Sequence, residues 1–466
     1  MPDSLSRTFS RYVSYLGYES LPANVIDKIK ASLLHGLVIS IIGSETDHGK
    51  SAIELAKSEE SKPDGATILV DGSRVTRYGA AFANSKLMHV TNQDDSYKML
   101  THPGVCIIPA GLATAQLSRS SGRDLITALA AGYEVASRVA GDFIPSTQAR
   151  GFRSSPIFGT IGTAVTTGKL LNLGEDHLVT ALALACTFAA GTNEGPRTGG
   201  REMLFHEPNA TRNGIMAALL AREGVKCSET ALEGDAGFYN AFVGNNRGEL
   251  SYVFEGPDKV DLQNISSELG QRWELMHVVQ KIYPTEGYNC PVIELMTDIR
   301  AAHQLNIDDI DAINVSMNWL ETSYPSPAFP NATRIVPGVG STHYFAAYTC
   351  VNGYYPALRR RIDAGAQAPV DEQVVMDLVK KIEVTGYKDR PAFAPKIMIR
   401  MKGGTIYEGE YKGRELEWDL ATETRRITAL FDDIPFDSDK LYSLVETITG
   451  LEREEGIESM LDLCVR

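Results

Sequence analysis

The chain has 466 residues, 43% of them hydrophobic, and a formal net charge of −14 at pH 7. This length exceeds one ordinary compact core, so we expect two domains, with three as an alternative. The composition excludes a disordered chain, and 41 Gly with 21 Pro exclude a collagen-like one. The acidic charge argues against nucleic acid, and weakly against an anionic membrane surface, as partners.

The six cysteines are spread along the chain, and the closest pair is Cys186 and Cys227. No CxxC or zinc-ribbon spacing occurs, so we predict no metal site, with a [4Fe–4S] cluster on three distant cysteines as an alternative. The N-terminus lacks the basic and apolar regions of a signal peptide, and the apolar stretch 37–42 is too short to span a membrane. We therefore expect a cytoplasmic protein with reduced thiols and no membrane partner.

Residues 1 to about 270 are predicted to be mostly helical. In the segment 24–42, apolar residues recur at spacings of three and four after Pro22, which indicates a helix. Only the segment 67–75 predicts a hairpin, with two β-rich runs around Asp71-Gly72. Further helices are expected over 78–90, 106–119, 123–140, 157–171, 175–190 and 209–223.

The pattern changes near residue 272. The sequence predicts helices over 291–303, 342–351 and 371–381, and strands over 273–283, 311–319, 382–385, 397–401 and 405–411. Amphipathic helix returns from about 419. We therefore predict a two-domain fold, with a large all-α helical domain over 1–271 and 412–466 and a smaller α+β lid domain over 272–411.

Common nucleotide and nucleophile motifs are absent from the sequence. No G-x-G-x-x-G follows a predicted strand, and neither H-E-x-x-H nor G-x-S-x-G occurs. The stretch from Gly162 to Lys169 imitates a phosphate-binding loop, but its spacing is one residue too long and Leu170 replaces the required Ser or Thr.

A polar segment at 89–104 separates two apolar helices. So many ionisable groups beside Pro103-Gly104 predict a loop that faces a cavity, and the alternative is a solvated loop with helix-capping residues. The segment contains His89, Asn92, Asp94, Asp95, Ser96, Tyr97, Lys98 and His102.

Two further clusters stand just before predicted helices. Arg153 precedes one helix, and the segment 194–214 carries Arg197, Arg201, His206 and Arg212 before an Ala-rich one. Cations at such places can receive carboxylates, aided by the helix N-terminus. The alternatives are a basic surface loop and a lone surface arginine.

Four stretches resemble the MmgE/PrpD family: AAFANSKLMHVTNQDDSY with the THPG that follows, FRSSPIFGTIGTA, FHEPNATRNGIMAALLAREG and LEGDAGFYNAF. The family includes 2-methylcitrate dehydratase, cis-aconitate decarboxylase and iminodisuccinate epimerase, and the resemblance covers nearly the whole chain. It implies a helical domain with an α+β lid, an active site between them, a small polycarboxylate substrate and a homodimer.

The resemblance also implies roles for individual residues. His102 stands where the family has its catalytic histidine, and Asp94 with Asp95 keeps the family's aspartate pair. Ser96 replaces a threonine, and Tyr348 matches a tyrosine near the active site of the decarboxylases.

Three departures from the family pattern argue against dehydration and decarboxylation. Asn92 replaces an aspartate, Arg153 replaces a histidine and Met203 replaces a lysine. All three family chemistries need a base that removes a proton next to a carboxylate, and cations that stabilise the resulting charge. An epimerase needs no acid for a leaving group, so it tolerates these losses best.

We therefore predict an epimerase acting on an imino-dicarboxylate such as iminodisuccinate. His102 is expected to be one base, with Tyr348 or Lys98 as the second, and Asp94 or Asp95 to orient a base. We expect the substrate carboxylates to be bound by Asn92, Ser96, Arg153, His206, Arg212 and Lys281, without a cofactor.

Two alternatives stay open at this point. One is a dehydratase of the 2-methylcitrate type, in which Arg153 and Lys98 substitute for the missing groups. The other is a catalytically inactive binding protein that kept the fold.

Overall fold

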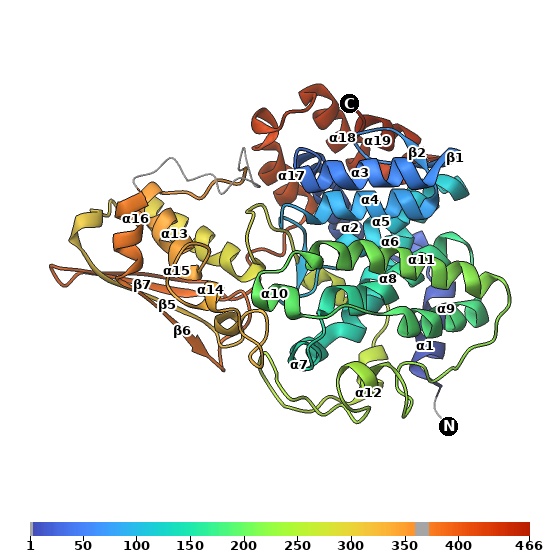
Figure 1. The fold of residues 1–466 in the computed structure, drawn as a ribbon, viewed down its shortest axis with the longest axis horizontal. Helices are drawn as coiled ribbons and strands as arrows, with labels where there is room; N and C mark the ends of the chain where they lie inside the picture. Colours follow the sequence, from blue (N-terminus) through green and yellow to red (C-terminus); the bar gives the residue numbers. More distant parts are fainter. Residues whose placement is uncertain (1–2, 359–371) are drawn as a thin grey trace.

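The computed structural model describes residues 3–358 and 372–466. It consists of a large helical part and a smaller α+β part that extends from one side of it (Figure 1). The helices expected in the first half of the chain are confirmed, with shifted ends, as α2 (Ala23–Gly43), α4 (Arg77–His89), α5 (Gly104–Ser118), α6 (Gly122–Ala140), α8 (Ser154–Leu170), α9 (Glu175–Phe188) and α11 (His206–Arg222). The structure adds helices for which no range was predicted: α1 (Leu5–Tyr15), α3 (Asp47–Glu60), α7 (Ile144–Ala149), α10 (Glu194–Thr198) and α12 (Phe238–Phe242).

The core of the helical part is formed by helices that approach each other closely. Helix α8 packs against α6 on one side and α11 on the other. A Cβ atom on Gly162 would lie 2.9 Å from the carbonyl oxygen of Gly132, and one on Gly214 would lie 2.7 Å from that of Thr160. These glycines, in the middle of α8 and of α11, therefore allow close contacts that larger residues would prevent.

The predicted hairpin forms with a different first strand. Strand β1 (Ser61–Thr67) pairs with β2 (Arg74–Val75) in antiparallel orientation, so the strand precedes the segment expected to form it. In the turn, the N–H of Ile68 donates to the carbonyl oxygen of Ser73, and the N–H of Val70 donates to that of Cys464 near the C-terminus.

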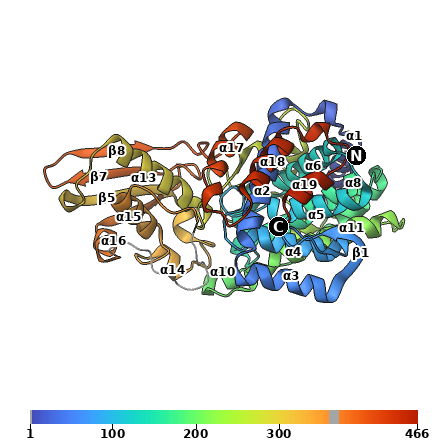
Figure 2. The same cartoon turned by 90° about the horizontal axis from the view of Figure 1, so that it is seen from above.

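The α+β part contains a four-stranded sheet in the order β6 (Ile382–Tyr387), β5 (Ile310–Asn318), β7 (Lys396–Met401) and β8 (Ile406–Glu410). Strands β5 and β6 are parallel and the other pairs are antiparallel. The parallel pair needs a long connection, and α14 (Ala332–Ile335), α15 (Thr342–Asn352) and α16 (Glu372–Val379) lie within it. Helices α13 (Cys290–Ala302), α15 and α16 lie beside the strands, as Figures 1 and 2 show. Position 371, where we expected α16 to begin, lies outside the described residues.

The strand predicted over 273–283 is wrong. A 3₁₀ turn occupies Glu274–His277, and only Val278–Val279 forms a strand, β4. Its partner, β3 (Ser96–Tyr97), is equally short, because Lys98 and Met99 turn away with φ angles of 42° and 71°. This brief pairing joins the polar loop to the segment that carries Lys281.

The C-terminal helices return to the helical part, as expected. They are α17 (Leu420–Thr428), α18 (Ser438–Thr449) and α19 (Glu458–Leu463), and α17 packs on α2. The fold is thus a large helical domain with a smaller α+β domain, and the limits at 272 and 411 stay predictions. None of the described helices combines the length and the apolar character needed to cross a bilayer.

Candidate active site

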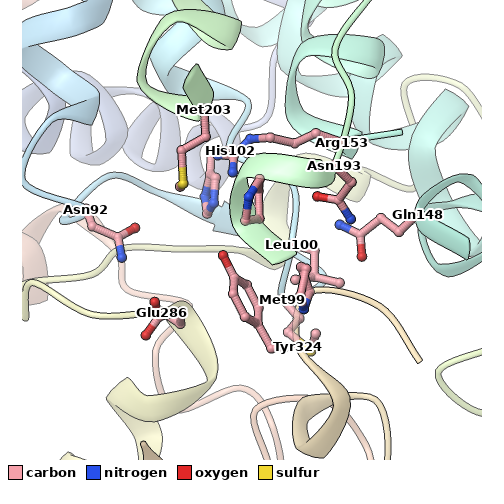
Figure 3. A pocket seen from close by; sticks show the side chains of 13 residues that line it. Asn92, Met99, Leu100, His102, Gln148, Arg153, Asn193, Met203, Glu286 and Tyr324 are labelled. Carbon is pink, nitrogen blue, oxygen red and sulfur yellow. The ribbon is translucent and has the colours of Figure 1, made fainter. Parts of the chain in front are cut away.

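A small cavity lies where the helical part meets the segment leading into the α+β part, and its volume is about 20 Å³. Figure 3 shows its side chains converging from several loops. Helical-part residues form most of the wall, and the remainder comes from two loops after residue 283. The lining residues are Asn92, Met99, Leu100, His102, Gln148, Arg153, Asn193, Pro196, Met203, Glu286, Gly287, Tyr324 and Pro325.

The imidazole of His102 is held by the backbone of its own loop. Its Nδ1 atom lies 2.8 Å from the carbonyl oxygen of Asp95. A carbonyl oxygen only accepts, so Nδ1 carries the proton and Nε2 keeps its lone pair. Burial lowers the pKa of His102 to about 3, although the nearby Asp94 opposes this shift. The ring is therefore neutral at ordinary pH, and Nε2 has a free lone pair.

Asp95 is itself anchored at the start of α5. Its carboxylate accepts hydrogen bonds from the N–H of Gly104 at 2.9 Å and from the hydroxyl of Tyr133 at 2.7 Å. A Cβ atom on Gly104 would collide with both of these side chains. Glycine at this position therefore allows the contact that fixes the Asp95 carbonyl under His102.

Behind the cavity, five buried side chains form a continuous chain of charges. The Asp94 carboxylate lies 2.6 Å from Nζ of Lys281 and 2.5 Å from Nδ1 of His89. His89 Nε2 lies 3.3 Å from Glu207, whose other oxygen lies 2.7 Å from Nη2 of Arg153. Lys281 and Arg153 thus face the carboxylates of Asp94 and Glu207, and the buried ring of His89 connects the two pairs.

The two carboxylates of this network stay ionised. Burial alone would raise the pKa of Glu207, but Arg153 and His89 lower it to about 2. Burial would likewise raise the pKa of Asp94, but the charge of Lys281 and the hydrogen bond from His89 hold it well below its ordinary value. Asp94 therefore gives His102 a fixed negative neighbour, at 3.7 Å from Nδ1.

Arg153 lines the cavity, and one edge of its guanidinium group is bound to Glu207. Its Nε and Nη2 atoms both lie within 2.9 Å of one oxygen of Glu207. This contact fixes the plane of the group and leaves Nη1 for a ligand carboxylate. Nearby, Nδ2 of Asn193 and Oε1 of Gln148 are buried without a hydrogen-bond partner among the described residues. A ligand in the cavity can satisfy both.

Tyr324 lies across the cavity, and its hydroxyl points into it, toward the side of His102 and Arg153 (Figure 3). Burial, with Glu286 next in effect, raises the pKa of Tyr324 to about 12. The phenol therefore keeps its proton at neutral pH and can donate it. The sequence analysis missed Tyr324, since it belongs to no recognised motif.

The structure brings several of the predicted site residues together. His102, Asn92 and Arg153 line the cavity, and Asp94 and Lys281 lie directly behind it. Lys281 also donates to Oδ1 of Asn92 at 3.2 Å.

Ser96 and His206 lie close to the site without lining the cavity. Ser96 is fully buried, and its hydroxyl faces the backbone of Gly287. His206 begins α11, next to Glu207.

Three predicted site residues lie elsewhere. Lys98 forms an ion pair with Asp142 in a separate cavity, because its left-handed φ directs the chain away. Tyr348 belongs to an aromatic cluster, with its ring 5.0 Å from that of Tyr355. Arg212 is six residues beyond His206 on α11, hence on another face, where it pairs with Glu60 at 3.0 Å.

Other contributors went unrecognised in the sequence analysis. His89 stands in the polar segment, and Glu207 follows His206, so both lay beside residues that were singled out. Glu286, Gln148 and Asn193 carry no sequence signal. Within residues 3–358 and 372–466, no group of three or more His, Cys, Asp or Glu side chains is placed to hold a metal ion.

Comparison with known proteins gives relatives that are named as cis-aconitate decarboxylases or as similar to them. The chain is 27% identical to a cis-aconitate decarboxylase-like protein, oryM, of Aspergillus oryzae, over 59% of this chain and 57% of that protein. It is 24% identical to the cis-aconitate decarboxylase of Aspergillus terreus (67% of this chain, 64% of that protein) and 29% identical to the human one (53% and 51%). The matches thus span about half to two thirds of the length of these relatives.

The family itself is identified by the first half of the chain. The model of the MmgE/PrpD N-terminal domain matches residues 7–251. This range carries the polar loop, Arg153 and Glu207, and so most of the wall of the cavity. The chain belongs to the MmgE/PrpD family.

Proposed function

We propose that the protein is a lyase that removes water from a small hydroxy-polycarboxylate. The observation that carries this proposal is the tautomer of His102, which places a neutral Nε2 base in a cavity that also holds Arg153 and the protonated Tyr324. The curated relatives support a lyase, since they are named for decarboxylation of a polycarboxylate, cis-aconitate.

In this proposal Arg153 binds the carboxylate next to the reacting carbon. His102 Nε2 takes the proton from that carbon, and the guanidinium stabilises the enolate-like charge that develops. The electron pair then forms the carbon–carbon double bond while the C–O bond breaks. Tyr324 gives its proton to the departing hydroxyl, which leaves as water, and the proton held by His102 restores the phenol.

Asp94 offsets part of the cost of charging the buried His102 in this proton transfer. When His102 accepts the proton it becomes a cation, and ionised Asp94 lies 3.7 Å from its Nδ1. The Asp95 carbonyl keeps the ring oriented in both protonation states, because Nδ1 donates to it throughout. Neither group has to move during the reaction, which keeps the reorganisation cost low.

Decarboxylation is the second candidate, favoured by the names of the relatives. In that reaction Arg153 would stabilise the carbanion formed by loss of CO₂, and a protonated group of the cavity would protonate the carbon. Epimerisation of an imino-dicarboxylate would use His102 and Tyr324 as two bases on opposite faces. No relative supports it, so we rank it third.

Proton NMR of the protein in D₂O distinguishes these reactions. The substrates 2-methylcitrate, cis-aconitate and iminodisuccinate would be supplied separately. We expect olefinic product signals from 2-methylcitrate. Loss of a carboxyl group from cis-aconitate would instead establish the decarboxylase, and deuterium with a changed diastereomer ratio in iminodisuccinate would establish the epimerase.

Two arginine variants provide the matched control. Arg153→Met should abolish turnover, whereas Arg212→Met, which changes an arginine paired with Glu60 on α11, should leave it intact. Wild-type turnover by Arg153→Met, or no product signal from any of the three substrates, would contradict the proposal.

A further inference from the structure

Glu286 introduces a carboxylate into a cavity that otherwise suits anions. It lines the cavity together with Asn92, as Figure 3 shows, and it is 8% exposed. Arg153 enters from another part of the wall, as the same view shows. A ligand composed only of carboxylates would be repelled at this end, so Glu286 calls for a different ligand group there.

The hydrogen bonds of Glu286 are all long. Nε of Arg334 lies 3.3 Å from Oε1, and Thr285 and Asn289 lie 3.3 and 3.5 Å from Oε2. Good bonds of this kind measure about 2.9 Å, as the contacts of Glu207 do. The carboxylate of Glu286 is therefore held only by weak hydrogen bonds, and its oxygens can still accept a hydrogen bond from a ligand.

Arg334 does not turn this end of the cavity into an anion site. Its side chain is 36% exposed, and Nη1 donates to the carbonyl oxygen of Gly340 at 3.0 Å. It pairs with Glu286 without lining the cavity itself. The acceptor oxygens of Glu286 are what the cavity presents, and an ionised carboxylate has only acceptors to offer.

Tyr324 and Glu286 line the same cavity, as Figure 3 shows. A hydroxyl group between them would donate its hydrogen to Glu286 and accept one from Tyr324. Donation to Glu286 would turn a lone pair of that oxygen toward the phenol. This is the orientation needed for the hydroxyl to leave as water.

We propose that Glu286 is a specificity-determining residue that accepts a hydrogen bond from the substrate hydroxyl, so that the cavity selects hydroxy-polycarboxylates over counterparts lacking that group. The inference rests on the proposed function and deepens it. It also provides for product release, because the dehydrated product no longer has the hydroxyl that Glu286 binds.

Citrate and tricarballylate test this directly by isothermal titration calorimetry. Both carry three carboxylates on the same carbon skeleton, and they differ by one hydroxyl. We expect the wild-type protein to bind citrate about tenfold more tightly, the value of one hydrogen bond to a charged group. Glu286→Leu should bring the ratio close to one, and Glu286→Gln, which keeps an acceptor, should give an intermediate ratio.

Arg334→Gln is the matched control. If Glu286 selects the hydroxyl, this variant keeps the preference for citrate. If Glu286 only holds Arg334 for a carboxylate, Arg334→Gln and Glu286→Leu should both weaken the two ligands equally, and this would overturn the inference. A wild-type protein that binds neither ligand, or binds both equally, would also overturn it. A citrate preference that depends on Glu286 in a protein without dehydratase turnover would uphold the inference while refuting the proposed reaction.

Discussion

The Nδ1 atom of His102 donates to the backbone carbonyl of Asp95 at 2.8 Å, while the Asp94 carboxylate stays 3.7 Å away. The orientation of the ring thus depends on a group that cannot titrate. Asp94 contributes charge instead of the orienting hydrogen bond. The base in this site is therefore positioned by the fold of its own loop, and that loop is held by α5 and α6 through Gly104 and Tyr133.

The pH dependence of kcat/KM should lack an acid limb near pH 6.5, the ordinary pKa of histidine. Burial lowers the pKa of His102 to about 3, so the ring is neutral and competent at all higher pH and loses this function only as the pH falls toward that value. Steady-state kinetics between about pH 4 and 8 check this. An acid limb near 6.5 that belongs to the free enzyme would show that His102 is not the buried neutral base described above.

Gly104→Ala should slow turnover by about a hundredfold, the effect of misplacing a reacting group by about 1 Å. The added methyl group meets Asp95 and Tyr133, so the carbonyl under His102 must shift. Gly17→Ala is the control, since the space around Gly17 is open. The measurement is kcat of both variants, and equal values would disprove the positioning role of Asp95.

Glu207→Gln should lower the free energy of unfolding by about 3–5 kcal/mol, because it leaves the charge of Arg153 buried and uncompensated. Glu194→Gln removes the carboxylate of an exposed pair with Arg197 and should cost less than about 1 kcal/mol. Urea unfolding of both variants measures the difference. Similar values would mean that the buried network does not stabilise the fold as its geometry indicates.

His35 should make stability depend on pH. Its ring bridges Glu423 at 2.8 Å and the carbonyl oxygen of Gln93 at 2.7 Å. Burial alone would lower the pKa of His35, but Glu423 outweighs it and the pKa is raised above 6.5. The stabilisation is therefore complete below pH 6.5 and is lost as the pH rises through the folded-state value.

Comparing wild type with His35→Gln by urea unfolding at several pH values tests this. The stability difference between the two proteins should be largest below pH 6.5 and should shrink as the pH rises. A difference that grows with pH would reverse the sign of the linkage and contradict the assignment.

The helices could be predicted because their signal is local. Apolar spacing and small residues identify α2, α6 and α8 without knowledge of their partners. The strand expected over 273–283 failed because pairing needs a partner strand, and β3 ends after two residues. Its apolar residues are buried by tertiary contacts instead, which alternation along one segment cannot reveal.

Only part of the candidate site could be predicted from the sequence. His102, Asp94 and Asn92 share one loop, so their proximity follows from the chain itself. Tyr324 and Glu286 reach the cavity from distant segments, and only the fold brings them to His102.

The type of reaction was harder to predict from the sequence than the position of the site. The replacement of an aspartate, a histidine and a lysine of the family pattern by Asn92, Arg153 and Met203 favoured an epimerase. The relatives fit a lyase better. The homodimer implied by the family stays a prediction.

The most direct test of the central claim is the rate of 2-methylcitrate dehydration by His102→Gln, beside His177→Gln as a control on the exposed surface of α9. General-base catalysis contributes up to about 10⁴-fold, and we expect His102→Gln to lose about 10³-fold in kcat while His177→Gln equals the wild type. A His102→Gln protein that retains the wild-type rate of olefin formation would contradict the assignment of Nε2 as the base.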